Sequence, residues 1–146
     1  MPGSDILGQG IQLSERFVQS ALDALSAHIA ILDETGTVIS VNRAWCRFAQ
    51  ENGYESGCGV GTNYLMVCES AQGQHAGEAP QMAQGIRAVM NQIVEEFTLE
   101  YPCHAPHQKR WFVVRISRFD WEGESRYIVA HQDVSELKRV QLELAA

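Results

Sequence analysis

The chain has 146 residues, of which 45 % are hydrophobic and 20 % are charged, a balance that fits one globular domain and excludes wholesale disorder. Its formal net charge of −7 excludes a generic nucleic-acid binder and disfavours contact with an acidic membrane, because both need a basic protein surface. No apolar run approaches the ~20 residues that span a bilayer, and residues 1–10 lack the features of a signal peptide, so we expect a cytoplasmic chain.

The amino-terminal part predicts an amphipathic helix. Residues 1–12 hold three glycines and a proline, and we expect them to form a flexible lead-in. Over residues 13–26, apolar side chains recur every three to four positions, which is the period of a helix. The stripe that they form consists of Leu13, Phe17, Ala21 and Leu25.

The middle of the chain predicts a hairpin followed by helices. An apolar run and a β-branched run, joined by a turn that contains Gly36, favour two paired strands. Asn42 suits the N-cap of the next helix, and Pro80 suits the first turn of a later one. The expected elements are strands over 28–32 and 37–41, a helix over 43–52, a loop over 53–63, an apolar turn over 64–68 and a helix from Pro80 to Ile93.

The last third changes to the period of a strand. Phe97, Leu99 and Tyr101 alternate with polar residues, which is typical of a half-buried strand. Strands gathered at both ends of a chain, with helices between them, favour an α+β fold with an antiparallel sheet and helices packed on one face. The remaining elements expected are strands over 110–119 and 127–132, and a helix from Ser135 that carries Leu137, Val140 and Leu144.

Three stretches of the sequence resemble the PAS sensory domains. Residues 30–44 resemble the opening hairpin and its Asn-capped helix, and residues 100–112 resemble the central hairpin of a subgroup common in bacterial sensors. Residues 133–136, Asp-Val-Ser-Glu, resemble the Asp-Ile-Thr motif at the exit of the domain. The resemblance implies the PAS fold, a five-stranded antiparallel sheet with helices on one face, with its core over 27–133 and an exit helix from 134 to 146.

The resemblance also implies a function. It implies a sensory module without catalytic activity of its own, joined by the exit helix to an effector in the parent chain, such as a histidine kinase of a two-component system or a diguanylate cyclase. We expect it to bind a small molecule and to form a homodimer through Phe17, Ala21 and Leu25. The alternatives are a constitutive dimerisation module without ligand, the PAS domain of a transcriptional regulator, and a small-molecule enzyme built on the pocket.

A ligand pocket is expected between the sheet and the helices. Its candidate lining residues are Trp45, Phe48, Tyr64, Phe97, Phe112, Val114 and His131. The alternative for the aromatic residues is a packed core, and for His131 it is a core histidine bonded to the Trp111 backbone or another protein group. In the exit motif, Asp133, Ser135 and Glu136 are expected to transmit the signal, with Arg43 or Arg47 as the partner of Asp133.

The sequence argues against the familiar cofactors of the family, and the ligand stays unidentified. Tyr64 stands where the light-sensing flavin members carry their reactive cysteine, so we expect no flavin adduct. Residues 78–93 hold no histidine where the haem-binding members have one. The four cysteines form no CxxC pair and favour free thiols, and the stretch 103–107 offers only three metal ligands where zinc usually needs four, so no metal site is expected.

Overall fold

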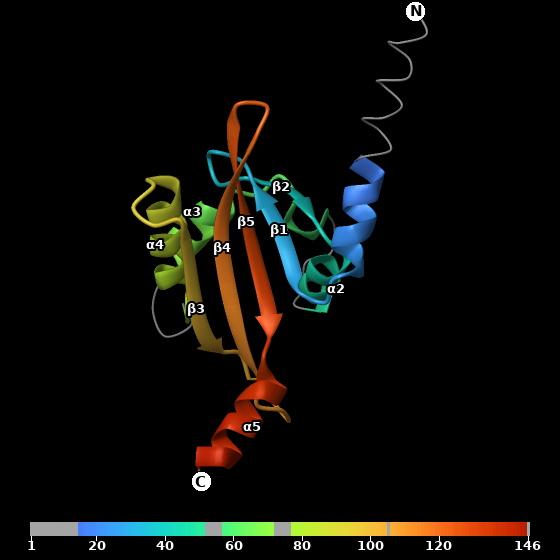
Figure 1. Cartoon of the computed structure of the whole chain (residues 1–146), viewed down its shortest axis with the longest axis vertical. Helices are drawn as coiled ribbons and strands as arrows, with labels where there is room; N and C mark the ends of the chain where they lie inside the picture. The colour runs from blue at the N-terminus through green and yellow to red at the C-terminus, as the bar shows by residue number, and fades with distance from the viewer. Residues whose placement is uncertain (1–14, 52–56, 72–76, 105, 146) are drawn as a thin grey trace, which may run out of the picture.

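The computed structural model describes residues 15–51, 57–71, 77–104 and 106–145. An amino-terminal helix over 15–24 precedes a strand pair, a group of helices, three further strands and a final helix, as Figure 1 shows. In chain order the elements are β1 (His28–Leu32), β2 (Val38–Val41), α2 (Arg43–Glu51), the 3-10 helix η1 (Gly57–Gly59), α3 (Tyr64–Ser70), α4 (Ala79–Met90), β3 (Glu96–Pro102), β4 (Trp111–Trp121), β5 (Glu124–Asp133) and α5 (Ser135–Ala145).

The five strands form one antiparallel sheet in the order β2-β1-β5-β4-β3, which confirms the predicted α+β class. The first and last strands of the chain order meet at the centre, where His28 of β1 pairs with His131 of β5. The β4–β5 register runs without interruption from the pair of Phe112 and Asp133 to the hairpin turn. Each strand of this pair is therefore fixed relative to the other over its whole length.

The core lies between one face of the sheet and the helices α3 and α4. Every second residue of β5, from Tyr127 to His131, points into it, and β4 contributes Phe112, Val114 and Ile116 in the same way. Helix α4 adds Met82, Ile86 and Val89, which recur at helical spacing and are buried. This alternation of period two on the strands and near four on the helix is the pattern that the sequence displayed.

Asn42 connects four segments at the start of α2. Its side-chain oxygen accepts hydrogen bonds from the Trp45 amide at 2.9 Å, which caps the helix, and from the Ile29 amide of β1 at 3.0 Å. Its side-chain nitrogen donates to the carbonyl oxygens of Leu22 at 2.8 Å and Ala27 at 2.9 Å. Asn42 is 1 % exposed; its bond from the Ile29 amide is buried, and the other three bonds are partly buried.

The amino-terminal helix is attached to the domain through its polar side. The Gln19 side chain donates to the Val41 carbonyl oxygen at 3.1 Å, and the Asp23 carboxylate accepts from the Arg43 amide at 2.8 Å. The predicted apolar stripe faces the other way: Phe17 is 75 % exposed and Leu25 is 50 % exposed. Leu13 lies outside the described residues. The described part of one copy therefore leaves Phe17 and Leu25 uncovered.

Several predicted elements differ in the structure. The helix predicted over 13–26 ends at residue 24, so Leu25 lies just beyond it, and β4 and β5 extend further toward their shared turn than predicted. Residues 64–68, expected as a turn, begin the helix α3, because the Asn63 side chain caps it by accepting from the Met66 amide at 2.9 Å. Ile93 lies beyond the end of α4 and is 74 % exposed, so it is not a member of the helix stripe. Within the loop expected over 53–63, η1 forms a short helical turn.

In the part of the chain that the structure describes, no helix combines the length and the apolar composition that crossing a membrane requires.

Candidate functional site

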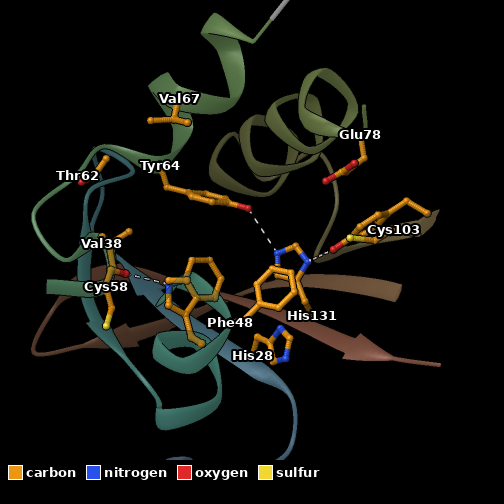
Figure 2. A pocket seen from close by; sticks show the side chains of 14 residues that line it. His28, Val38, Phe48, Cys58, Thr62, Tyr64, Val67, Glu78, Cys103 and His131 are labelled. Atoms are coloured by element: carbon orange, nitrogen blue, oxygen red, sulfur yellow. Dashed lines mark hydrogen bonds between the residues drawn. The ribbon is translucent and has the colours of Figure 1, made fainter. Parts of the chain in front are cut away.

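A cavity of about 210 Å³ lies between the inner face of the sheet and the helices α2, α3 and α4. Figure 2 shows its side chains converging from these elements, with aromatic rings on most sides. The lining residues are His28, Val38, Trp45, Phe48, Ala49, Cys58, Gly59, Thr62, Tyr64, Val67, Glu78, Tyr101, Cys103 and His131.

Four of the seven predicted lining residues lie at this cavity: Trp45, Phe48, Tyr64 and His131. The other three, Phe97, Phe112 and Val114, do not line this cavity and lie in or against the packed core. The Phe97 ring lies against Gly85 of α4, so close that a Cβ on that glycine would come within 2.2 Å of the ring. Phe112 is 2 % exposed and stacks on Tyr101, whereas Val114 is completely buried.

His131 is the centre of a hydrogen-bond chain inside the cavity. The hydroxyl of Tyr101 lies 2.5 Å from its Nδ1, and the hydroxyl of Tyr64 lies 3.4 Å from its Nε2. The Tyr64 hydroxyl also donates to the Met82 sulfur at 2.9 Å, so its proton is not directed at the histidine. The consistent assignment is that Tyr101 donates to Nδ1 and Nε2–H donates to the Tyr64 oxygen.

This arrangement keeps the imidazole neutral. Burial lowers the pKa of His131 to about 4, and the nearby His28 adds to the shift. The partners differ from the Trp111 backbone that the sequence suggested, because the Trp111 amide donates instead to the Ser135 hydroxyl at 3.0 Å. His131 is thus a core histidine satisfied by protein groups that also lines the cavity.

Several lining residues were missed by sequence reasoning. Tyr101 follows Phe97 and Leu99 on the inward face of β3, so the strand alternation contained the signal for it. Its pKa is raised, first by burial and then by the charge of Glu78. Glu78 and Cys58 carry no such signal, because they come from connecting segments whose position depends on the whole fold.

His28 forms the floor of the cavity next to His131. Its ring lies 4.6 Å from the Phe48 ring and 5.7 Å from the Phe112 ring, measured between centroids. Burial lowers the pKa of His28, and the carboxylate of Asp133 partly opposes that shift.

One wall of the cavity is held by a disulfide. Cys46 of α2 and Cys58 of η1 are bonded, with Cα atoms 5.0 Å apart, which corrects the prediction of free thiols for this pair. The two cysteines are 12 positions apart in the sequence, and the sequence pattern does not reveal their proximity. The Trp45 indole nitrogen donates to the Cys58 carbonyl oxygen at 3.1 Å, so the same contact positions a lining ring. Cys68 and Cys103 are free.

The exit motif connects β5 to α5 through Ser135. The Asp133 carboxylate accepts from the Ser135 amide at 2.9 Å and from its hydroxyl at 2.6 Å. Burial would raise the pKa of Asp133, but these bonds and the charge of Arg110 outweigh it and hold the pKa below its usual value. Neither Arg43 nor Arg47 bonds to it within the described residues, which corrects that expectation.

Helix α5 has two further attachments to the sheet. The Val134 amide donates to the Trp111 carbonyl oxygen at 2.9 Å, and Lys138 forms an ion pair with Glu100 at 2.7 Å. Glu136 is exposed in the first turn of the helix, where its negative charge interacts favourably with the positive end of the helix dipole.

No group of three or more potential metal ligands comes together in the described segments. In the stretch 103–107, the His104 Nδ1 is already occupied, because it accepts from the Arg110 amide at 2.9 Å.

Solved PAS domains share this architecture. The PAS domain of BvgS from Bordetella pertussis has a TM-score of 0.57 at 14 % identity, over 94 % of this chain and 98 % of that one. The PAS domain of an HTR-like protein from Haloarcula marismortui has a TM-score of 0.55 at 19 % identity, over 88 % and 98 % of the two chains. For a sensory box sensor histidine kinase from Vibrio cholerae the TM-score is 0.52 at 14 % identity, over 88 % and 98 %. At identities this low, the structural similarity shows a common fold and nothing further.

One longer protein is similar in sequence. The uncharacterized 104.1 kDa protein in the hypE 3' region of Rhodobacter capsulatus is 37 % identical over 123 residues, which cover 82 % of this chain. The chain spans 13 % of the length of that relative. No protein-family model matches the sequence.

Proposed function

The chain has the PAS fold, and on that premise we propose that it is a sensory domain that binds a small molecule in the aromatic cavity and relays its presence through α5. The observation that carries the proposal is the position of His131. Its side chain lines the cavity, and it stands two residues before Asp133, where β5 passes into the exit helix. A change in the cavity therefore acts on β5, the strand that leads into α5 and sets its direction.

The output is proposed to be an effector elsewhere in a longer bacterial signalling protein, such as a histidine kinase or a diguanylate cyclase. A cytoplasmic location and the absence of catalytic activity in the domain itself are part of the same proposal. The relative from Rhodobacter capsulatus, of which this chain spans 13 %, supports the idea that similar domains occur within much longer chains.

A thermal-shift screen of the purified domain against small metabolites tests the ligand part of this proposal. We expect at least one compound to raise the unfolding temperature, because a ligand that binds only the folded state stabilises it. The gain should disappear in Trp45→Ala, which removes a lining ring, and should persist in Trp121→Ala, which removes an exposed ring at the distant hairpin turn. A screen without any stabilising compound would favour the constitutive dimerisation module instead.

We further propose that the domain forms a homodimer through the stripe of Phe17, Ala21 and Leu25. The helix is already fixed by its polar side, so a second copy can cover the stripe without displacing it. On α5, Leu137 is 58 % exposed and Leu144 is 84 % exposed, so this helix offers a second apolar surface to a partner helix.

Phe17→Glu is expected to convert the dimer to a monomer, because it places a charge in the centre of the apolar contact. Sedimentation velocity at matched concentrations measures this directly. Trp121→Glu is the control, since it makes the same kind of change at an exposed aromatic residue on a different element, the end of β4. A wild-type domain that is monomeric at high micromolar concentration, or a Phe17→Glu variant that still dimerises, would refute the assignment.

Asp133→Ala is expected to uncouple the signal from the output while leaving the domain folded. The lost hydrogen bonds cap a helix terminus, so the free energy of unfolding should fall by about 1 kcal/mol. The readout is the effector response of a parent protein to its stimulus. Asp120→Ala, which removes a carboxylate with similar local bonds at the β4–β5 turn, should keep that response. A normal response in Asp133→Ala would place transmission elsewhere.

A further inference from the structure

Glu78 contributes a carboxylate to the cavity, and the described residues provide no hydrogen-bond or ion-pair partner for it. It is the N-cap residue of α4, but its side chain makes no capping hydrogen bond. Within the described segments no residue bonds to or forms an ion pair with this carboxylate. Figure 2 shows the carboxylate directed toward the space between Tyr64 and His131.

The remaining lining residues carry no charge that would neutralise it. None of them is a lysine or an arginine. The two histidines, His28 and His131, both have a pKa lowered by burial, so both are neutral near pH 7. Glu78 therefore gives the cavity a net negative charge, and its effect reaches the phenols of Tyr64 and Tyr101, whose raised pKa results first from burial and in part from this carboxylate.

Aromatic rings surround the space that this carboxylate faces. The Trp45 ring lies 5.7 Å from the Tyr64 ring and 5.8 Å from the His131 ring between centroids, and Phe48 also lines the cavity. The faces of such rings are negative and attract cations that have lost their water. The ring faces and the Glu78 carboxylate thus both favour a cationic ligand.

We propose that the cavity selects a small organic cation, an amine on an aromatic or short aliphatic body, with its ammonium group between Glu78 and the rings. This inference rests on the proposed ligand-sensing function and names the ligand class of that site. A cavity of about 210 Å³ is below the usual range of about 300–1,000 Å³ for drug-sized ligands, so the body of the ligand is a single ring or its equivalent. Anionic ligands are disfavoured, because no lining side chain offers a positive charge.

Three one-ring probes that differ mainly in charge test the inference: benzylamine, benzyl alcohol and benzoate. Calorimetric titration of the purified domain at pH 7 should show that benzylamine binds about tenfold more tightly than benzyl alcohol, and that benzoate binds more weakly than both. In Glu78→Gln the preference for the amine should disappear. Glu95→Gln is the matched control, because it removes the same charge from an exposed position outside the cavity and should keep the preference.

The outcomes separate this inference from the function on which it rests. Benzyl alcohol binding as tightly as benzylamine, or a preference that survives in Glu78→Gln, overturns the cation assignment and leaves ligand sensing intact. Failure of all three probes, together with a neutral or anionic hit in the metabolite screen, overturns it in the same way. Failure of the probes and of the whole screen overturns ligand sensing itself.

Discussion

Asn42→Ala is expected to destabilise the domain by about 3 kcal/mol or more, which combines a lost helix cap with buried groups left unsatisfied. The amide of Ile29 and the carbonyl oxygens of Leu22 and Ala27 all lose their partner at a position that is 1 % exposed. Urea unfolding followed by circular dichroism measures the loss in the free energy of unfolding. An unchanged midpoint would show that water replaces these bonds.

Asn63→Ala is the natural control, because Asn63 caps α3 in the same way. Its side chain accepts from the Met66 amide and donates to the Thr35 carbonyl oxygen, but both bonds are exposed. We expect this variant to cost about 1 kcal/mol, the usual value of a cap. The difference between the two variants reports the combined effect of burial and of the two additional hydrogen bonds that Asn42 makes.

Asn42→Asp separates the two roles of the side chain. The carboxylate still accepts from Ile29 and Trp45, but it cannot donate to Leu22 or Ala27. We expect the core to keep its hydrogen-exchange protection while the amides of residues 15–24 exchange faster. Equal protection of that helix in both proteins would contradict the role of Asn42 in holding it.

Below pH 6.5 the domain is expected to lose stability because of His131. The pKa of His131 is about 4 in the folded state, whereas the ordinary value is 6.5. Above pH 6.5 both states are neutral and the stability is complete. As the pH falls, the unfolded chain takes up a proton that the folded one refuses, and the loss reaches roughly 3 kcal/mol near pH 4 before it levels off.

His131→Gln should remove most of this pH dependence while keeping an acceptor for Tyr101. The relevant measurement is the slope of the free energy of unfolding between pH 7 and pH 4.5, not its absolute value. His28 adds a smaller slope of the same sign to both proteins, because its pKa is also lowered. The exposed His107, changed to Gln, is the control. Parallel slopes for wild type and His131→Gln would assign the pH dependence to other groups.

The strands were predictable because the alternation of buried and exposed positions in a half-buried strand appears in the sequence as an alternation of apolar and polar residues. Phe97, Leu99 and Tyr101 alternate with polar residues, and the structure gives them the corresponding burial in β3. The N-cap role of Asn42 was equally local. Alternation does not reveal which residue of another element a side chain will contact. The Phe97 ring lies against Gly85 of α4 and therefore does not line the cavity.

The unpredicted parts of the site come from short connections. Helix α3 has seven residues, too few for a repeating apolar pattern, and it begins because of one side chain, Asn63. Cys58 reaches the cavity because its backbone takes a left-handed conformation, with φ at 53°, in the segment bonded to Cys46. Glu78 precedes α4 and reaches the cavity from the start of that helix, a position that depends on the packing of the whole domain.

The unbroken pairing of β4 with β5 determines how far the end of α5 would move during signalling. Such a ladder resists sliding and bending, whereas the register of β1 with β2 already shifts between Ile31 and Leu32. Movement beside His131 would therefore tilt the β4–β5 ribbon as one body and carry α5 with it. A tilt of about 5° would displace the far end of this ~16 Å helix by about 1.4 Å. In the relay proposed above, the displacement at the effector would grow with the length of the helix, so a small rearrangement in the cavity would produce a larger one at its far end.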